Sequence, residues 1–334
     1  MRDTPIVSIR DVQYKFGVYA AFPARPFALR RGTIKGRRCA KADQAAGHQF
    51  KTMYTLRLLW FVPNTVAIVA AAWKLTPDVT LLAEHNPSSD AQFEALASGK
   101  VDAVVTAIDN VMDWNLRPGP KDLQVVAQLE QTTPLTLVGQ KGRAILQDLR
   151  GGTILVDAPR NGFIVALRAM LAEDGIAPDS YALESVGGVK ERYDALVAGQ
   201  GDATLLGPPF DSMAMAEGLN RIASVQECYP AFPGQGLVVS ARAMEGMRPA
   251  LSSWLAGLDT ARKRLGTDPE SAWLTLASAG FPATAVAAMI RAAPASLIPD
   301  RKGIELLIAQ RAKAGLAGAN TNYENLVELS VLPR

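Results

Sequence analysis

Cysteine and histidine are scarce in this sequence. Its 334 residues include two cysteines, Cys39 and Cys228, and two histidines, His48 and His85. The cysteines show no Cys-x-x-Cys or Cys/His spacing, and the histidines are too few and too far apart for a zinc cluster. We therefore expect neither a structural disulfide nor a metal site.

Catalytic motifs are also missing. The sequence contains no Walker loop, no Gly-x-Ser-x-Gly, no Cys/His dyad and no His-Glu-x-x-His. Gly151 and Gly152 precede an expected strand, which is the wrong order for a dinucleotide-binding loop. We therefore expect no cofactor and no catalytic residue, and we predict that the protein is not an enzyme.

Long apolar runs are absent too. In residues 16–29, Arg25 and two prolines leave an apolar core that is too short for a signal peptide. Residues 56–75 do not form a transmembrane helix, because Pro63 and Lys74 interrupt them. As written, the sequence shows no export signal. The expectation is either a cytoplasmic protein or a first segment of about fifty residues that is a wrongly assigned start.

Charge is low overall but unevenly distributed. The net charge is +3, with 11 Lys/Arg against 3 Asp in residues 1–53 and 24 basic against 29 acidic residues in the remainder. The body of the chain is therefore mildly acidic, which argues against nucleic acid as the main partner. The basic extension has no aromatic interleaving, and its glycines and prolines exclude a helix-turn-helix. We predict that residues 1–53 are disordered.

The sequence does contain an internal duplication. Residues 92–110, QFEALASGKVDAVVTAIDN, align with residues 192–210, RYDALVAGQGDATLLGPPF, at a spacing of one hundred positions. Each copy reads as an amphipathic helix that ends at a glycine and is followed by a buried strand. The alternative is that Ala-Leu-x-x-Gly is simply a common helix end. We favour two α/β lobes of similar build.

The remaining patterns alternate between strands and helices. Strands are expected at residues 55–62, 79–84, 102–107 and 123–129, then at 153–157, 182–186 and 203–206, with an edge strand at 222–226. Parallel sheets wound with helices follow from this order. Extended runs at 132–139 and 236–240 are expected to cross between the lobes, and the chain is expected to be helical from residue 245.

These patterns define a two-lobe domain plan. Residues 54–134 and 241–334 are predicted to form lobe 1, and residues 135–240 lobe 2. Two look-alike lobes with two crossover strands and a helical C-terminal segment resemble the type 2 periplasmic binding fold. Residues 55–240 more narrowly resemble solute-binding proteins of ABC importers of the nitrate, sulfonate, taurine and thiamine-pyrimidine class. The resemblance rests on LRLLWFVPN, FEALASGKVDAVVTAIDNV, AILQDLRGGTILVDAPRNGF and YDALVAGQGDATLLGPPF.

This resemblance implies a periplasmic monomer that captures a small molecule between its lobes and delivers it to an ABC permease. Two departures stand against it. The export signal is not visible, and the Glu-Gly-Leu-Asp-Val run usual in the class is replaced by KLTPDV. A cytoplasmic enzyme on the same fold, similar to thiamine-pyrimidine synthases or aromatic-acid decarboxylases, is the alternative. A regulatory effector domain is a third reading.

Candidate ligand-binding residues follow from the fold. Ligands of open α/β sheets lie at the carboxyl ends of strands, beside helix N-termini that attract anions. Lobe 1 then offers Trp60, Asn64, Thr65, Thr106, Asp109 and Asn110, and lobe 2 offers Arg160, Asn161, Phe163, Pro209 and Phe210.

Several of these residues also have structural interpretations. Asn64 and Asp109 are placed to cap helices, and Arg160 could pair either with an anionic ligand or with Asp157. Of Trp60 and Phe61, one should face the core and the other the cleft. The aromatic and charged candidates together indicate a small, partly aromatic acid or amide as the ligand.

Overall fold

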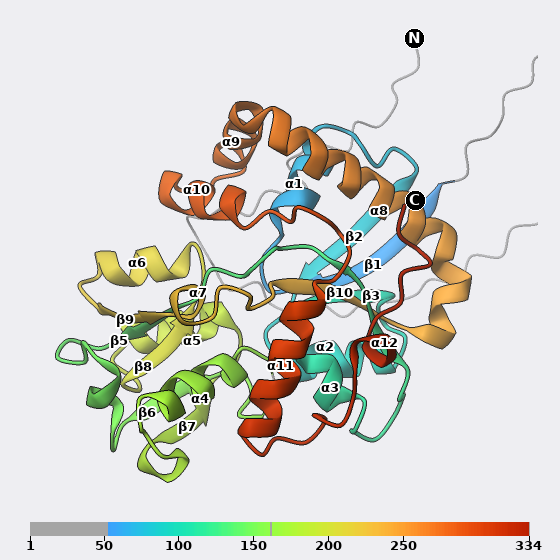
Figure 1. Cartoon of the computed structure of the whole chain (residues 1–334). Coiled ribbons are helices and arrows are strands. Elements are labelled where there is room, and N and C mark those ends of the chain that lie inside the picture. The colour runs from blue at the N-terminus through green and yellow to red at the C-terminus, as the bar shows by residue number, and fades with distance from the viewer. Residues whose placement is uncertain (1–52, 161, 334) are drawn as a thin grey trace, which may run out of the picture.

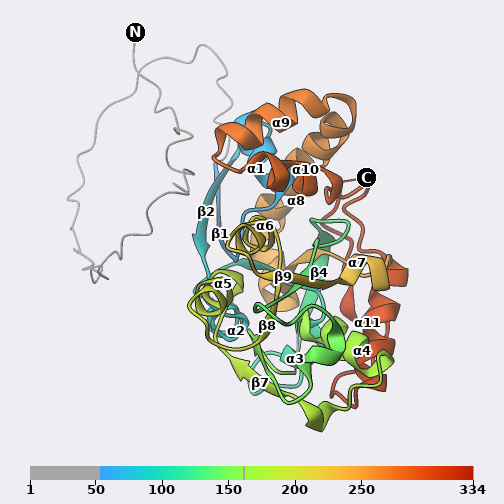
Figure 2. The same cartoon turned by 90° about the vertical axis from the view of Figure 1, so that its left-hand side faces the viewer.

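The computed structural model describes residues 53–160 and 162–333. The predicted disorder of the basic extension concerns residues that lie outside this part, apart from Met53. The described chain folds into two α/β lobes, each built on its own five-stranded sheet (Figures 1 and 2).

Lobe 1 contains a mixed sheet in the order β2-β1-β3-β10-β4. Its strands are β1 (Tyr54–Trp60), β2 (Val79–His85), β3 (Ala103–Ala107), β4 (Leu123–Gln128) and β10 (Gln235–Ser240). Strand β1 pairs in parallel with β2 and β3, whereas β10 is antiparallel to β3 and β4. Every residue of β3 and β10 is buried, as expected for apolar runs covered on both faces.

Lobe 2 repeats this plan in the order β7-β6-β8-β5-β9. Its strands are β5 (Thr136–Gly139), β6 (Thr153–Val156), β7 (Ala182–Ser185), β8 (Ala203–Leu206) and β9 (Asn220–Ser224). In each sheet a parallel trio is followed by one antiparallel strand, β10 in lobe 1 and β5 in lobe 2. The two sheets therefore share one strand order, and the duplication is a structural one. Strand β9 is the predicted edge strand.

The helices of the two lobes also correspond. Lobe 1 has α1 (Thr65–Ala72), α2 (Ser89–Ala97) and α3 (Asn110–Trp114), and lobe 2 has α4 (Ile164–Glu173), α5 (Val189–Val197) and α6 (Phe210–Ala216). Short 3-10 helices at Leu146–Leu149 and Pro178–Ser180 connect strands of lobe 2. Helices α2 and α5 both end before a glycine with positive φ, Gly99 and Gly199, as the duplicated pattern predicts.

The boundary between the lobes differs from the prediction at β10. Residues 236–240 were expected to cross between lobes, and 135–240 to form lobe 2, but β10 lies inside the lobe 1 sheet between β3 and β4. Likewise, β5 lies wholly inside the lobe 2 sheet. The connections themselves are residues 129–135 and 225–234, the latter including α7 (Val225–Cys228); we call them the two crossings. An apolar strand buried on both faces gains more as the centre of a sheet than as a linker.

The C-terminal region is helical, as predicted, and comprises α8 (Ala241–Thr267), α9 (Pro269–Ser278), α10 (Ala283–Arg291), α11 (Arg301–Lys313) and α12 (Tyr323–Leu326). Helix α8 packs on α1 and β1 of lobe 1, whereas α11 packs against α4 of lobe 2. The tail docks through a bridge between Val327 and Val125 of β4. Helix α11 therefore ties the end of the chain to both lobes.

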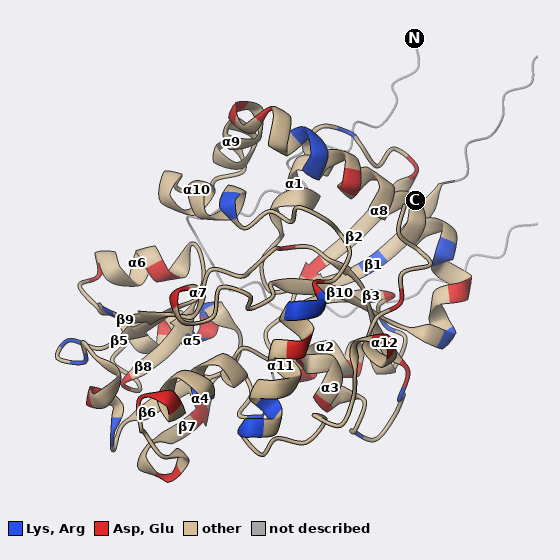
Figure 3. Cartoon of the chain, viewed as in Figure 1, with Lys and Arg blue, Asp and Glu red and all other residues tan. Residues whose placement is uncertain are grey.

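In the described part of the chain, no helix combines the length and apolarity that a membrane crossing requires. Lys/Arg and Asp/Glu residues are interspersed over both lobes in the view of Figure 3.

Candidate functional site

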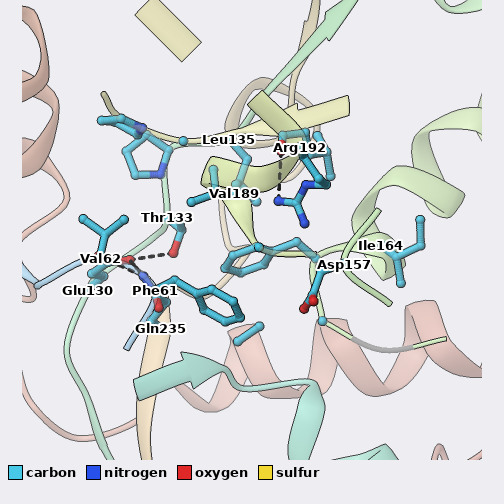
Figure 4. Close-up of a pocket in the computed structure, with 18 of the residues that line it drawn as sticks. Phe61, Val62, Glu130, Thr133, Leu135, Asp157, Ile164, Val189, Arg192 and Gln235 are labelled. Atoms are coloured by element: carbon cyan, nitrogen blue, oxygen red, sulfur yellow. Dashed lines mark hydrogen bonds between the residues drawn. The ribbon is translucent and has the colours of Figure 1, made fainter. Parts of the chain in front are cut away.

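A cavity lies between the two lobes, where the parallel strands of both sheets end. Its volume is about 110 Å³. A single water needs roughly 10–15 Å³ of such space, so the cavity has room for a small organic molecule. Its polar and aromatic lining comes from lobe 1 (Phe61, Thr65 and Asn110), from lobe 2 (Asp157, Phe163 and Arg192), from the first crossing (Glu130 and Thr133) and from the start of β10 (Gln235). Figure 4 shows a close-up of this cavity.

The walls of the cavity are mainly apolar. Phe61 follows β1, and Phe163 immediately precedes α4, where its ring lies 6.2 Å from that of Phe232. Aliphatic side chains fill the remaining wall, among them Val62, Leu135, Leu155, Ile164, Val189 and Met289. Such a lining favours a ligand with an apolar or planar body.

Arg192 is the one cation that lines the cavity among the described residues. The residue is 8% exposed, and its guanidinium donates to the carbonyl oxygens of Gly187 and Leu205, both at 3.2 Å. Its Nε has no hydrogen-bond partner. Burial lowers the pKa of Arg192, and the nearby carboxylates of Asp157 and Glu191 oppose that shift.

The duplication explains how Arg192 is positioned. The aligned residue of lobe 1, Gln92, donates from α2 to the carbonyl of Val105 in β3 at 2.9 Å. Arg192 makes the same helix-to-strand contact in lobe 2, to Leu205 in β8. The second lobe therefore carries a guanidinium where the first carries an amide.

Glu130 lines the cavity from the first crossing. Its Oε2 accepts a hydrogen bond of 2.6 Å from the Thr133 hydroxyl, and both of its carboxylate oxygens lie 3.3 Å from Nε2 of Gln235. Burial raises the pKa of Glu130, and the Thr133 and Gln235 hydrogen bonds oppose this shift. Among the described residues, no Lys, Arg or His pairs with it.

Asp157 joins the two lobes across the cavity. Both of its carboxylate oxygens accept from the backbone N–H of Ser89, at 3.1 and 3.2 Å, and Ser89 is the first residue of α2 in lobe 1. Burial raises the pKa of Asp157, and the nearby charge of Arg192 opposes this shift. A carboxylate at a helix N-terminus is electrostatically favourable.

Two further contacts connect the rims of the lobes. The Gly188 N–H of lobe 2 donates to the Pro87 carbonyl of lobe 1 at 2.6 Å. His85 Nε2 lies 3.6 Å from Glu191 Oε1, and its Nδ1 lies 3.0 Å from the Phe61 carbonyl. The nearby Glu191 carboxylate raises the pKa of His85, and burial opposes that shift. The structure is therefore that of lobes closed onto one another.

Asp109 has a different environment from the predicted one. It neither caps α3 nor lines the cavity, and its Oδ2 accepts from Arg311 Nη1 at 2.7 Å and from the Gly162 N–H at 2.8 Å. The same Arg311 nitrogen donates to the Arg160 carbonyl at 3.1 Å. Burial raises the pKa of Asp109 to about 6, and Arg311 opposes that shift. Asp109 is thus a buried structural link between α11 and both lobes.

Three of the predicted residues line the cavity, namely Thr65, Asn110 and Phe163. The Thr65 hydroxyl donates to the Met289 carbonyl at 3.0 Å. Asn110 donates to the Thr106 hydroxyl at 2.6 Å, so Thr106 lies behind the wall and is fully buried.

The structure places the other candidates outside the lining. Trp60 packs in the lobe 1 core, because side chains of a strand alternate and Phe61 takes the cavity side. Asn64 is 1% exposed and caps α1 by accepting from the Ala67 N–H at 3.0 Å. Arg160 is exposed, and only its carbonyl contributes a contact to this region.

The lobe 2 candidates at the end of β8 are also structural. Phe210 is 5% exposed and packs against Tyr193, with ring centroids 5.4 Å apart and the rings tilted by 43°. Pro209 follows a cis peptide bond and leads into α6, while its neighbours Gly207 and Pro208 line the cavity. Asn161 lies outside the described residues.

The charged lining residues Glu130, Asp157 and Arg192 and the amide of Gln235 were not among the predicted site residues. The duplication could have indicated Arg192 as a site residue. At the aligned position of lobe 1, which contacts the end of a strand, the residue is the neutral Gln92. Glu130 carried none, because it follows β4 in what reads as a polar linker. In the described residues, no group of three or more His, Cys, Asp or Glu side chains is placed to hold a metal ion.

The paired lobes, the two crossings and the cavity between them define a two-lobed binding-protein fold of the periplasmic type. Solved structures with this fold are similar over most of their length. The ligand-binding component of an ABC-type import system from Staphylococcus aureus is 14% identical, with a TM-score of 0.69, and 84% of this chain covers 98% of that one.

Two further structures extend the comparison. The alkanesulfonate-binding protein SsuA from Xanthomonas axonopodis pv. citri, bound to MOPS, is 20% identical, with a TM-score of 0.63 and coverage of 79% and 92%. The nitrate-binding protein NrtA from Synechocystis is 11% identical, with a TM-score of 0.66 and coverage of 84% and 87%. At these identities the likeness shows the fold.

Residues 78–272, more than half of the chain, match the family described as NMT1/THI5 like. The chain belongs to this family, and the predicted resemblance to its class is confirmed. Comparison with curated protein sequences gives no match.

Proposed function

We propose that this protein is a solute-binding protein that captures a small organic ligand between its lobes and delivers it to an ABC-type permease. The single observation that carries the proposal is a cavity lined by both lobes, by the first crossing and by the start of β10. The family and the names of structural neighbours, which bind alkanesulfonate or nitrate or serve ABC import, support it.

The mechanism is hinge closure without bond making. The lobes are joined by the two crossings. Loop residues between domains act as hinges, because their backbone dihedral angles change when the lobes rotate and close on a ligand. A bound ligand contributes contacts to both lobes and adds to the Asp157–Ser89 and Gly188–Pro87 contacts of the closed form. Opening then requires the loss of these contacts, which a permease would promote by binding the open form.

The cavity supports transport over the enzymatic alternative. Its described lining contains no cysteine, histidine or lysine, so thiolate, imidazole and amine chemistry have no residue there. We further propose that the protein acts as a monomer, in the periplasm, without a cofactor, a metal or a nucleic-acid partner.

Thermal-shift screening combined with X-ray scattering tests this function. Sulfonates, aromatic acids, ureides, pyrimidines and nitrate would be screened, and a true ligand should raise the melting temperature and reduce the radius of gyration by stabilising closure. Mass spectrometry of the recovered ligand should show it unchanged. Turnover of the ligand would support the enzyme instead, and the absence of any binder that stabilises closure would contradict the proposal.

A further inference from the structure

The charged groups of the cavity lie at two separate poles. In Figure 4, Glu130, Thr133 and Gln235 gather on one side and Arg192 and Asp157 on the other, with Phe61 between them. We call these the carboxylate pole and the guanidinium pole.

The guanidinium pole has an unused hydrogen-bond donor. Arg192 donates only to two backbone carbonyls, and its Nε has no partner although the side chain is more than nine-tenths buried. No carboxylate lies within salt-bridge distance of it among the described residues. A buried guanidinium without an ion-pair partner is unfavourable, and a ligand oxygen that accepts from it relieves that cost.

Asp157 does not neutralise this pole completely. Its two oxygens already accept from the Ser89 N–H at the start of α2, so its hydrogen bonds serve contact between the lobes. Its charge acts on Arg192 through space without a direct contact. Arg192 therefore lines the cavity and retains one donor, Nε, that has no partner among the described residues.

The carboxylate pole has the opposite character. Glu130 receives hydrogen bonds from the neutral side chains of Thr133 and Gln235, and no cation pairs with it in the described part of the chain. A carboxylate in this position attracts an N–H-donating group, above all a cationic one. A simple anion would satisfy Arg192 alone and would add negative charge to a cavity that already contains two carboxyl groups.

We propose that the cavity selects a small bipolar molecule with an ammonium or other N–H-donating group at Glu130, an anionic or acceptor group at Arg192, and an apolar body between the poles. This inference rests on the proposed solute-binding function. It assigns Glu130 and Arg192 as the residues that determine ligand specificity.

The position of Glu130 also links recognition to the hinge. The two crossings touch at this residue, because a Cβ on Gly234 would lie 2.5 Å from the Glu130 carbonyl oxygen and 2.6 Å from its Cβ. Gln235, which follows directly, donates to the Glu130 carboxylate. A ligand group held by Glu130 therefore binds at the point where the first crossing contacts the end of the second.

Two matched trios of compounds test the inference on the full chain. One trio is 4-(aminomethyl)benzoate, 4-methylbenzoate and 4-methylbenzylamine, and the other is 5-aminopentanoate, pentanoate and pentylamine. Thermal shift and calorimetry would be run with nitrate, methanesulfonate and acetate alongside. We expect one bipolar compound to bind about tenfold or more tightly than its plain acid and its plain amine, as charged hydrogen bonds predict.

Two variants assign this preference to the poles. Glu130→Gln should abolish the preference for the bipolar compound over the acid, and Arg192→Gln should abolish its preference over the amine. Glutamine is a fitting replacement for Arg192, since Gln92 makes the equivalent contact in lobe 1. Glu184→Gln, at an exposed site of β7, is the control and should leave both preferences unchanged.

The outcomes separate the inference from the function. If the plain acids, methanesulfonate or nitrate bind as tightly as the bipolar compounds, the bipolar inference is wrong and the solute-binding function stands. Binding of no compound in the trios or among the anions would count against both. Should a variant fail to fold, the ratios measured within each trio on the unmodified protein decide the question.

Discussion

Asp109 and Arg311 form the most deeply buried ion pair among the described residues, with side-chain exposures of 1% and 0%. Asp109 Oδ2 also accepts from the Gly162 N–H, and Arg311 Nε donates to the Ala317 carbonyl at 2.9 Å, whereas Asp109 Oδ1 has no partner in the described part of the chain. Removal of one partner leaves an uncompensated charge in the interior, which costs much more than the pair itself contributes.

Arg311→Met should therefore destabilise the ligand-free protein by about 3–5 kcal/mol. Urea unfolding measures this free energy. Arg221→Met is the matched control, because Arg221 forms an exposed pair with Glu227 at 2.5 Å and such pairs contribute about 1 kcal/mol or less. Equal losses in the two variants would contradict a structural role for the buried pair.

This pair also shows what sequence could not reveal at the scale of residues. Asp109 follows a strand and precedes a helix, which placed it correctly at the strand end, but its partner lies 202 positions away. Local pattern predicts the end of an element and not the long-range contact of a side chain. The same limit separates Trp60, which faces the core, from Phe61, which lines the cavity.

At the scale of elements, helix α8 is anchored by close approach of its backbone to lobe 1. A Cβ on Gly257 would lie 2.6 Å from the Leu75 carbonyl oxygen and 2.4 Å from Cγ2 of Thr76. Gly246 of the same helix has no neighbour within 4 Å of its Cβ position. The two glycines thus share a helix and differ in packing.

Gly257→Ala should lower the free energy of unfolding by about 1–3 kcal/mol through overpacking. Gly246→Ala should raise the free energy of unfolding by about 0.5–1 kcal/mol, because alanine has a higher helix propensity than glycine and its Cβ would meet no neighbouring atom here. Thermal unfolding of the two variants and the parent measures both changes. A stabilised Gly257→Ala protein would show that α8 can shift away from residues 75 and 76 at little cost.

Element order was largely predictable, because buried strands and glycine-ended helices have distinct periodicities. Strand β10 was misplaced for a physical reason. An apolar run flanked by glycine has the same pattern whether it crosses between lobes or forms a strand of a sheet. Strand β10 lies in the sheet because β3 and β4 leave a place between them where it pairs with both. That position is created by parts of the chain more than one hundred residues earlier.

At the scale of the whole molecule, function depends on the balance between open and closed lobes. His85 of lobe 1 and Glu191 of lobe 2 face each other across the rim, and Lys190 is the neighbouring cation that opposes His85 protonation. The pKa of His85 is raised in the closed form by the nearby carboxylate of Glu191. Its contribution to closure is therefore fully present at pH values below the ordinary histidine pKa, and it is lost as the pH rises through the raised value.

The closed fraction should accordingly fall as the pH is raised from about 6 to 8.5 across the histidine range. Because a partly exposed pair contributes about 1 kcal/mol or less, the ratio of closed to open molecules should change by no more than about fivefold. Fluorescence energy transfer between labels on the two lobes measures this ratio. Glu191→Gln should flatten the profile and Glu184→Gln should not, since Glu184 is exposed on β7, away from the rim pair. A Glu191→Gln protein with the parent's pH profile would assign the pH dependence to another group, and closure would then rest on the backbone contacts of Gly188 and Ser89.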